Sequence, residues 1–222
     1  MTDEPKAVLD VGCGTGLITR NLMEFVDRVD GVDFSENMIE TAKILPNGNH
    51  PGTNWICGPV EEVLLSPPYA LITAGQSLHW MDWEVVSPRL KESLTRNGYL
   101  AIVGQKNSPM PWDGDLFKKI IPTYSTNQDF VPYNLVEELE SRNLFHFKKG
   151  EKSVKPVSFQ QSIDDYVESF HSMNGFSRER MTEEAAHGFD SEVRELVSKY
   201  CPEGEMVLQS VGKVVWGNPT TK

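Results

Sequence analysis

The sequence predicts an α/β fold: a mostly parallel sheet of seven strands with a late antiparallel strand pair and a helical cap. Three observations predict it. The first hundred residues alternate short apolar runs with amphipathic helical patterns, which is typical of a parallel sheet with crossover helices. The 222 residues are enough for one large hydrophobic core. Hydrophobic residues make up 39% and charged residues 24% of the chain, an ordinary balance for a folded domain.

Five short apolar runs in the N-terminal part predict the parallel strands. A helix that begins at Leu17 and turns Phe25 inward separates the first two strands. Ser35 can cap the next helix, which is predicted to turn Met38 inward. A third helix, from about Glu84, leads into the fifth strand. The predicted strands are residues 7–11, 29–33, 54–57, 70–74 and 99–104.

The pattern changes after Gly104, where proline and asparagine become frequent. Ser162 is a predicted N-cap for a longer helix, because an acidic residue follows it three positions later. A further helix is predicted to start near Ser191 and to bury Tyr200. The predicted elements are helices at 116–121 and 136–141, antiparallel strands at 145–159 and 205–216, and cap helices at about 160–200.

Charge and composition narrow the class of ligand. The 21 Lys and Arg residues against 32 Asp and Glu give a net charge of −11, which disfavours a nucleic-acid partner because phosphates need cations. No apolar stretch is long enough to cross a membrane, and the N-terminus has no apolar signal segment. The cysteines have neither metal-ligand spacing nor a disulfide framework. We therefore expect a cytoplasmic protein with no metal, whose partner is a small molecule. The three cysteines are Cys13, Cys57 and Cys201.

A glycine-rich loop follows the first predicted strand and opens the first helix. The run from Leu9 to Gly16 reads LDVGCGTG, with the spacing G-x-G-x-G instead of the G-x-G-x-x-G of dinucleotide folds. Asp10 precedes the loop, where a carboxylate would repel a pyrophosphate and attract a cationic amine or sulfonium. Asp33 ends the second strand, where a carboxylate can accept hydrogen bonds from ribose hydroxyls. Taken alone, the glycines could form a plain strand–helix turn, and Asp33 could be an acidic residue that flanks a helix. Together the two features indicate a ligand site.

These motifs make the sequence similar to class I S-adenosylmethionine-dependent methyltransferases, which have a Rossmann-like fold. The matching runs are VLDVGCGTG at 8–16, GVDFSENM at 31–38 and AGQSLHW at 74–80. The last run is most similar to the small-molecule type 11 branch that includes trans-aconitate methyltransferase. The resemblance implies transfer of a methyl group from S-adenosylmethionine to a small-molecule acceptor, a carboxylate among the candidates, by in-line displacement. It implies a single methyltransferase domain at 1–222, with a cofactor-binding half at 7–105 and a C-terminal half at 106–222.

The resemblance also implies which residues hold the cofactor. The loop glycines would pass under its methionine part, with Asp10 near the ammonium group. Asp33 would take the ribose hydroxyls, and Phe34 and Met38 would line the adenine. Pro59 stands where the family often has an acidic residue that meets the adenine amine. The implied cofactor-binding residues are Asp10, Gly12, Cys13, Gly14, Gly16, Asp33, Phe34, Met38, Pro59, Val60, Ala74 and Gln76.

His79 is the candidate catalytic residue, because it follows the fourth strand at the end of the sheet where ligands bind. Imidazole titrates near neutral pH and can act as a general base. The alternative is a first-turn helix residue that only positions the loop, and Trp80 is expected to pack. Ser66-Pro-Pro-Tyr69 matches a motif of amino-methyltransferases, but it precedes the fourth strand instead of following it. We therefore prefer to interpret Ser66–Tyr69 as a proline-rich loop.

Other features leave alternatives open. His171 either lines an acceptor pocket or faces solvent, and Cys13 is more plausibly a small loop residue than a nucleophile. Only six residues precede the first strand, where relatives carry lid helices, so an S-adenosylmethionine-binding protein with little turnover is the alternative function. A basic cluster is either a solvated face or a site that steers an anionic acceptor. Its members are Arg142, Lys148, Lys149, Lys152 and Lys155.

Overall fold

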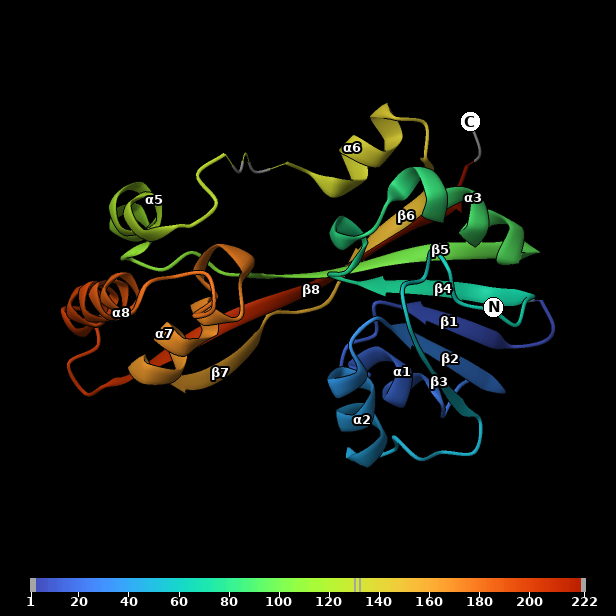
Figure 1. Ribbon diagram of the computed structural model, residues 1–222, viewed down its shortest axis with the longest axis horizontal. Helices are drawn as coiled ribbons and strands as arrows, with labels where there is room; N and C mark the ends of the chain where they lie inside the picture. Colours follow the sequence, from blue (N-terminus) through green and yellow to red (C-terminus); the bar gives the residue numbers. More distant parts are fainter. Residues whose placement is uncertain (1–2, 130, 132, 221–222) are drawn as a thin grey trace. The chain divides into compact units, whose positions relative to one another are not determined.

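The computed structural model describes residues 3–129, 131 and 133–220, with the backbone alone at 147–149. Its strands form one sheet in the order β3-β2-β1-β4-β5-β8-β6, and β7 also pairs with β8 (Figure 1). The pairs β3–β2, β2–β1, β1–β4 and β4–β5 are parallel, whereas β8 runs antiparallel to β6 and β7. The predicted fold class is confirmed: a mostly parallel sheet followed by late antiparallel strands.

The chain divides into two compact units. Unit 1 comprises Met1–Gly104, Tyr133–Val154 and Gly212–Lys222, and unit 2 comprises Gln105–Pro132 and Lys155–Val211. The change of sequence pattern after Gly104 therefore falls at one of the boundaries between them. Strands β5 and β8 each contribute residues to both units.

Unit 1 contains the parallel strands and the helices that cover them. Leu9 and Val11 of β1 join a core with α3 and α6, whereas Val8 packs with Met23 after α1. Strand β1 therefore alternates between the two faces of the sheet. The elements are β1 (Ala7–Val11), α1 (Leu17–Leu22), β2 (Arg28–Asp33), α2 (Glu36–Ile44), β3 (Thr53–Cys57), β4 (Tyr69–Gly75), η1 (Leu78–Trp80), α3 (Trp83–Ser93), β5 (Leu94–Asn107), α6 (Leu135–Ser141), β6 (Phe145–Ser153) and β8 (Glu205–Pro219).

Unit 2 packs helices beside the β7–β8 pair, around a core rich in aromatic side chains. Trp112 and Phe189 are among its fully buried residues, and Tyr166 and Phe170 stack edge to face. The elements are α4 (Asp113–Asp115), the π-helix η2 (Leu116–Ile120), α5 (Ile121–Tyr124), β7 (Val157–Ser162), α7 (Ile163–His171), η3 (Asn174–Phe176) and α8 (Glu183–Ser198).

Several predicted details of the elements are wrong. Helix α1 ends at Leu22, so Phe25 is not on its inward face and is 70% exposed. Met38 is 44% exposed instead of buried, while Ser35 does cap α2 by accepting a hydrogen bond from the Met38 amide. The predicted strand at 145–159 is two strands, because Pro156 lacks the N–H that a continuous ladder needs.

Helix α8 begins eight residues before the predicted start. Thr182 caps it by accepting a hydrogen bond from the Ala185 amide, and Glu183 and Glu184 occupy its first turn. These polar residues hide the apolar spacing at this end, which is why the pattern is visible only from about Ser191. Tyr200 lies beyond the helix and is 48% exposed, so the prediction that it is buried is wrong.

Candidate functional site

The glycine loop, Gly12–Gly16, lies at the carboxyl end of β1 and has the left-handed backbone that its sequence predicts. Gly12, Gly14 and Gly16 have φ of +64°, +54° and +75°, and Gly16 is the N-cap of α1. A Cβ at Gly16 would overlap the indole ring of Trp55, and one at Gly12 would overlap the Ser77 side chain. A Cβ at Gly14 would meet nothing within 4 Å. Gly14 is therefore the loop glycine beside open space.

Asp33 joins the end of β2 to this loop. Its Oδ2 accepts a hydrogen bond from the Gly14 amide at 2.8 Å, and its Oδ1 accepts one from the Ser35 amide at 2.9 Å. The residue is 8% exposed. Each carboxylate oxygen has a second lone pair for a further donor. The structure thus brings together two motifs that lie 19 residues apart in the sequence.

Large apolar side chains lie exposed next to Asp33. Phe34 is 76% exposed, and Met38, one helical turn further on, is 44% exposed. The end of β3 is attached to the same place, because the Gly58 amide donates to the Asp33 carbonyl oxygen at 2.9 Å. Pro59 is exposed and Val60 is buried, so that Val60 offers its backbone rather than its side chain.

Asp10 lies at the end of β1 but is withdrawn from the surface. It is 1% exposed, and its Oδ2 and Oδ1 accept hydrogen bonds from the hydroxyls of Thr19 and Thr73, both at 2.7 Å. Burial raises the pKa of Asp10 to about 6, although the two hydroxyl groups act to lower it. Any attraction of Asp10 for a cationic ligand would therefore act through the loop instead of by contact at the surface.

Cys13 is a thiol and not a nucleophile at neutral pH. Burial raises the pKa of this group, and the charges of Asp10 and Asp33 raise it further. The Sγ atom donates to the Gly14 carbonyl oxygen at 3.7 Å. These observations agree with the interpretation of Cys13 as a small loop residue.

The segment after β4 places the polar side chains of Gln76 and Ser77 near the carboxyl end of the sheet. Ala74 is buried within β4, and Gln76 follows it with a left-handed φ of +52° and an exposed side chain. Ser77 is buried and donates a hydrogen bond from Oγ to the Val11 carbonyl oxygen at 2.6 Å. Ser77 thereby ties this segment to the last residue of β1.

His79 lies in the short helix η1, next to Trp80. Their ring centroids are 4.9 Å apart, and burial lowers the pKa of His79 below its usual value. The imidazole is therefore neutral at pH 7 and can accept a proton. Trp80 contacts His79 but is 63% exposed, so the expected packing leaves most of its side chain at the surface.

Sequence reasoning missed several residues that build this site. Trp55 fills the space beside two glycines, since a Cβ at Gly16 or Gly31 would overlap its ring, and its Nε1 donates to Gly48. Thr19 and Thr73, which hold Asp10, come from α1 and β4. The signal available was a tryptophan on β3 opposite a glycine, Gly31, of the neighbouring strand β2. The threonines gave no signal in the sequence.

The Ser66–Tyr69 motif lies at the other end of β4. Residues 66–68 form a loop before the strand, and Tyr69 begins it. The Tyr69 hydroxyl donates to Asp30 at 2.6 Å and is buried, which leaves it no role at the carboxyl ends of the strands. The interpretation of this motif as a proline-rich loop is confirmed.

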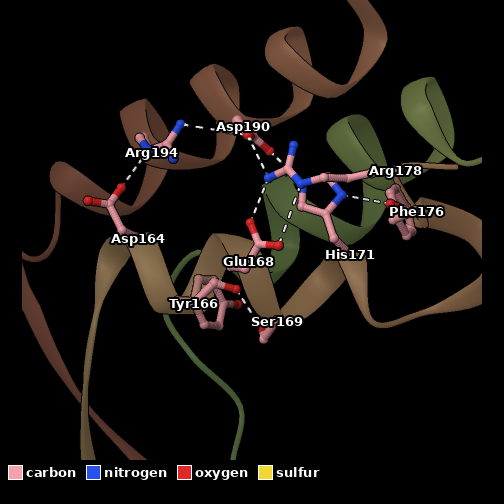
Figure 2. Close-up of polar contacts among 9 residues, drawn as sticks. All are labelled: Asp164, Tyr166, Glu168, Ser169, His171, Phe176, Arg178, Asp190 and Arg194. Carbon is pink, nitrogen blue, oxygen red and sulfur yellow. Dashed lines mark hydrogen bonds and ion pairs between the residues drawn. The ribbon is translucent and has the colours of Figure 1, made fainter. Parts of the chain in front are cut away.

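His171 in unit 2 neither faces solvent nor offers a free ring nitrogen (Figure 2). Its side chain is 3% exposed; Nδ1 lies 2.6 Å from the Phe176 carbonyl oxygen, and Nε2 lies 2.7 Å from Oδ1 of Asp190. Burial alone would raise the pKa of Asp190, but hydrogen bonds from His171 and Arg178 outweigh burial and keep the pKa below its usual value. A carbonyl oxygen at one ring nitrogen and a carboxylate at the other engage both nitrogens. His171 thus ties α7 to α8.

Arg178 extends this network to Glu168, with an Nη2–Oε2 distance of 2.6 Å (Figure 2). Replacing His171 by glutamine should lower the free energy of unfolding by about 2 kcal/mol, because Asp190 would lose a buried hydrogen-bond partner. The matched control is His187→Gln, an exposed histidine on α8, which should change it by less than about 0.5 kcal/mol. Urea unfolding measures both variants. Equal losses in both would contradict the assignment.

The basic cluster is only partly described. Arg142 pairs with Glu138, with an Nη2–Oε1 distance of 2.6 Å, and lies 5.0 Å from the ring centre of Trp83. The cation of Arg142 is therefore already matched by a carboxylate. Lys152 and Lys155 are exposed, as a solvated face predicts. The side chains of Lys148 and Lys149 lie outside the described residues.

Two properties of the described part of the chain bear on the kind of site it can hold. None of its helices has the length and apolar character needed to cross a membrane. No group of three or more His, Cys, Asp or Glu residues in that part is arranged to hold a metal ion.

Comparison with known proteins adds to the geometry. Residues 8–98 match a family model described as a methyltransferase domain. A malonyl-[acyl-carrier protein] O-methyltransferase of Halalkalibacterium halodurans is 36% identical over 106 residues, which is 44% of this chain and 38% of that protein. A ubiquinone biosynthesis O-methyltransferase of Bradyrhizobium diazoefficiens is 31% identical over 96 residues, covering 42% of this chain and 38% of that protein. The chain thus spans well under half the length of these relatives.

Solved structures extend the likeness over nearly the whole chain. A protein of Anaeromyxobacter dehalogenans assigned as a type II methyltransferase has a TM-score of 0.66 at 21% identity, covering 97% of this chain and 91% of its own. The YcgJ protein of Bacillus subtilis has a TM-score of 0.56 at 15% identity, covering 97% and 93%. At these identities the likeness establishes the fold. Residues 8–98 are thus similar to methyltransferase domains, and nearly the whole chain shares the fold of these solved structures.

Proposed function

We propose that this chain binds S-adenosylmethionine along the glycine loop and transfers its methyl group to an oxygen of an acceptor. The observation that carries the proposal is the position of Asp33, bonded to the Gly14 amide beside the open side of the loop. This arrangement leaves carboxylate lone pairs for ribose hydroxyls next to a backbone that a ligand can approach.

The residues present fit the cofactor. The open space beside Gly14 suits the methionine part, and the exposed rings and chains of Phe34 and Met38 suit an adenine. Asp10 supplies a buried negative charge that would favour a sulfonium or an ammonium group. Pro59 offers no acidic side chain to the adenine amine, so the backbone near Val60 and the side chain of Gln76 are the remaining polar groups.

The bound cofactor would supply a methyl group already activated by its sulfonium charge. The work of the protein is then to align the acceptor and exclude water. His79, neutral at pH 7, would take a proton from a hydroxyl acceptor. A carboxylate acceptor is ionised at this pH and would need no base.

Two acceptor classes follow from the relatives. Malonyl-[acyl-carrier protein] O-methyltransferases suggest a carboxylate on a small acyl group, either free or carrier-linked. The ubiquinone biosynthesis relative suggests a hydroxyl on a ring. We favour the carboxylate, since most of the relatives carry the first name. Placement in the trans-aconitate methyltransferase-like branch stays a prediction.

Replacing Phe34 by alanine should weaken binding of S-adenosylhomocysteine about tenfold, because an aromatic wall for the adenine would be lost. The control is Phe25→Ala. Both phenylalanines are exposed residues of unit 1, but Phe25 precedes β2 whereas Phe34 follows it. Calorimetry on the whole chain measures both. Equal affinities for the two variants would remove Phe34 from the site, and no binding by the folded wild type would overturn the proposal.

Turnover is tested separately from binding. The chain is incubated with methyl-labelled S-adenosylmethionine and fractionated cell-extract metabolites. The acidic metabolites should accept the label, and mild alkali should release it again, because a methyl ester hydrolyses in alkali. Tight cofactor binding with no label in any fraction would favour a binding protein with little turnover. Label that resists alkali would instead favour the hydroxyl acceptor.

A further inference from the structure

We propose that Ser77 is a positioning residue that couples the glycine loop to the segment carrying His79 and Trp80. The inference rests on the proposed function, since it assigns the cofactor to the loop. Its physical content is one hydrogen bond, from the Ser77 hydroxyl to the Val11 carbonyl oxygen at 2.6 Å. Val11 ends β1, and the loop begins at the next residue.

This hydrogen bond lies beyond the point where the sheet itself holds the two segments together. Strands β1 and β4 pair in register from Val8↔Leu71 to Asp10↔Thr73. Beyond Asp10 and Thr73 the backbone hydrogen bonds between these strands stop, although both segments continue toward the site. The Ser77 side chain bridges them there, in place of a further backbone rung.

Packing reinforces the bridge. The Ser77 side chain lies so close to Gly12 that a Cβ on Gly12 would overlap it, and the Met81 methyl group lies 3.2 Å from the same position. Ser77 is 6% exposed, so its hydroxyl has little access to water as an alternative partner. The loop and the segment after β4 are therefore in direct contact as well as hydrogen-bonded.

The chain around Ser77 transmits its position to the candidate catalytic segment. Gln76 turns the chain with a left-handed φ, and its backbone N–H donates to the Val103 carbonyl oxygen of β5 at 3.0 Å. The Trp80 amide donates to the Ser77 carbonyl oxygen at 3.0 Å, which closes the turn that contains His79. A shift of Ser77 would accordingly move His79 and Trp80 relative to the glycine loop.

A matched residue separates this role from ordinary stabilisation. Ser87, on α3, is also buried in unit 1, at 7% exposed, and its hydroxyl also donates to backbone carbonyl oxygens, those of Leu144 and Thr220. Ser77→Ala and Ser87→Ala each remove a buried hydroxyl that donates to the backbone, and Ser87→Ala should destabilise the fold at least as much as Ser77→Ala. Only Ser77→Ala should affect the cofactor site.

The experiment uses S-adenosylhomocysteine as the probe and the whole chain labelled with fluorotryptophan. The chain has five tryptophans, and a Trp80→Phe variant identifies the fluorine signal of Trp80. On saturation with the probe, the Trp80 signal should shift in the wild type and in Ser87→Ala, and this shift should be lost in Ser77→Ala. Calorimetry should show affinity about 3- to 10-fold lower for Ser77→Ala and unchanged for Ser87→Ala.

The two possible failures are distinguishable. If the wild type binds the probe but the Trp80 signal does not shift, or shifts equally in Ser77→Ala, the coupling is refuted while the proposed function stands. Equal loss of affinity in both alanine variants would reduce Ser77 to a structural residue. Absence of any binding by the folded wild type would remove the proposed function itself.

Discussion

Gly14→Ala is expected to abolish detectable binding of S-adenosylhomocysteine while lowering the free energy of unfolding by only about 1–2 kcal/mol. The stability loss is that of a left-handed alanine at φ +54°, since the new methyl group would touch no protein atom within 4 Å. The binding loss follows because that methyl group would occupy the space proposed for the methionine part. Calorimetry and urea unfolding give the two quantities.

Two other glycines provide controls for this result. Gly204 of unit 2 has φ +80° and also has open space where a Cβ would be, so Gly204→Ala should match the stability loss and leave binding unchanged. Gly16→Ala should lower the free energy of unfolding by about 3 kcal/mol or more, because its methyl group would also overlap Trp55. If Gly14→Ala binds the probe as well as Gly204→Ala does, the cofactor does not lie along the loop.

Asp10→Asn is expected to stabilise the ligand-free chain above pH 6, by about 3 kcal/mol. Burial raises the pKa of Asp10 from 3.8 to about 6 in the folded chain. Between these two pH values the unfolded chain loses its proton first, so stability falls as pH rises through the window, and the penalty is complete above about pH 6. Asparagine carries no charge, and its amide can accept from one of Thr19 and Thr73 and donate to the other.

The measurement is the free energy of unfolding in urea, taken at about four pH values between roughly 3.5 and 7.5. The wild type should lose stability relative to Asp10→Asn as pH rises. The control, Glu24→Gln, changes an exposed acid of unit 1 and should follow the wild-type profile. Parallel profiles for wild type and Asp10→Asn would show that Asp10 titrates normally.

The same substitution has a functional counterpart. Binding of S-adenosylmethionine should weaken more than binding of S-adenosylhomocysteine, since only the first carries a sulfonium charge for the buried carboxylate to attract. The buried charge of Asp10 would then destabilise the fold but favour binding of S-adenosylmethionine over S-adenosylhomocysteine. Equal weakening of both ligands would limit Asp10 to holding the ammonium group.

The parts of the site that were predictable from the sequence are those written in a continuous motif. The loop glycines and Asp33 could be recognised because a left-handed turn after a strand needs glycine, and because parallel strands bring their carboxyl ends to one edge. The exposure of Phe34 is consistent with its implied place at the adenine.

The remainder depends on partners distant in the sequence. Thr73 meets Asp10 from 63 residues away, and Ser77 meets Val11 from 66 residues away. Single threonines and serines carry no signal of such contacts. The burial of His171 could not be predicted for the same reason, since its partner Asp190 lies on another helix.

The place of β8 in the sheet has a consequence for synthesis of the protein. Strand β8 lies between β5 and β6 but begins only at Glu205, whereas β6 ends at Ser153. On the ribosome, β1 to β5 can pair as they emerge. Strands β6 and β7 have no pairing strand until β8 is synthesised. A nascent chain that stalls before Glu205 therefore exposes the edges of β5 and β6 to other chains. Translation has to reach β8 before the sheet can be completed.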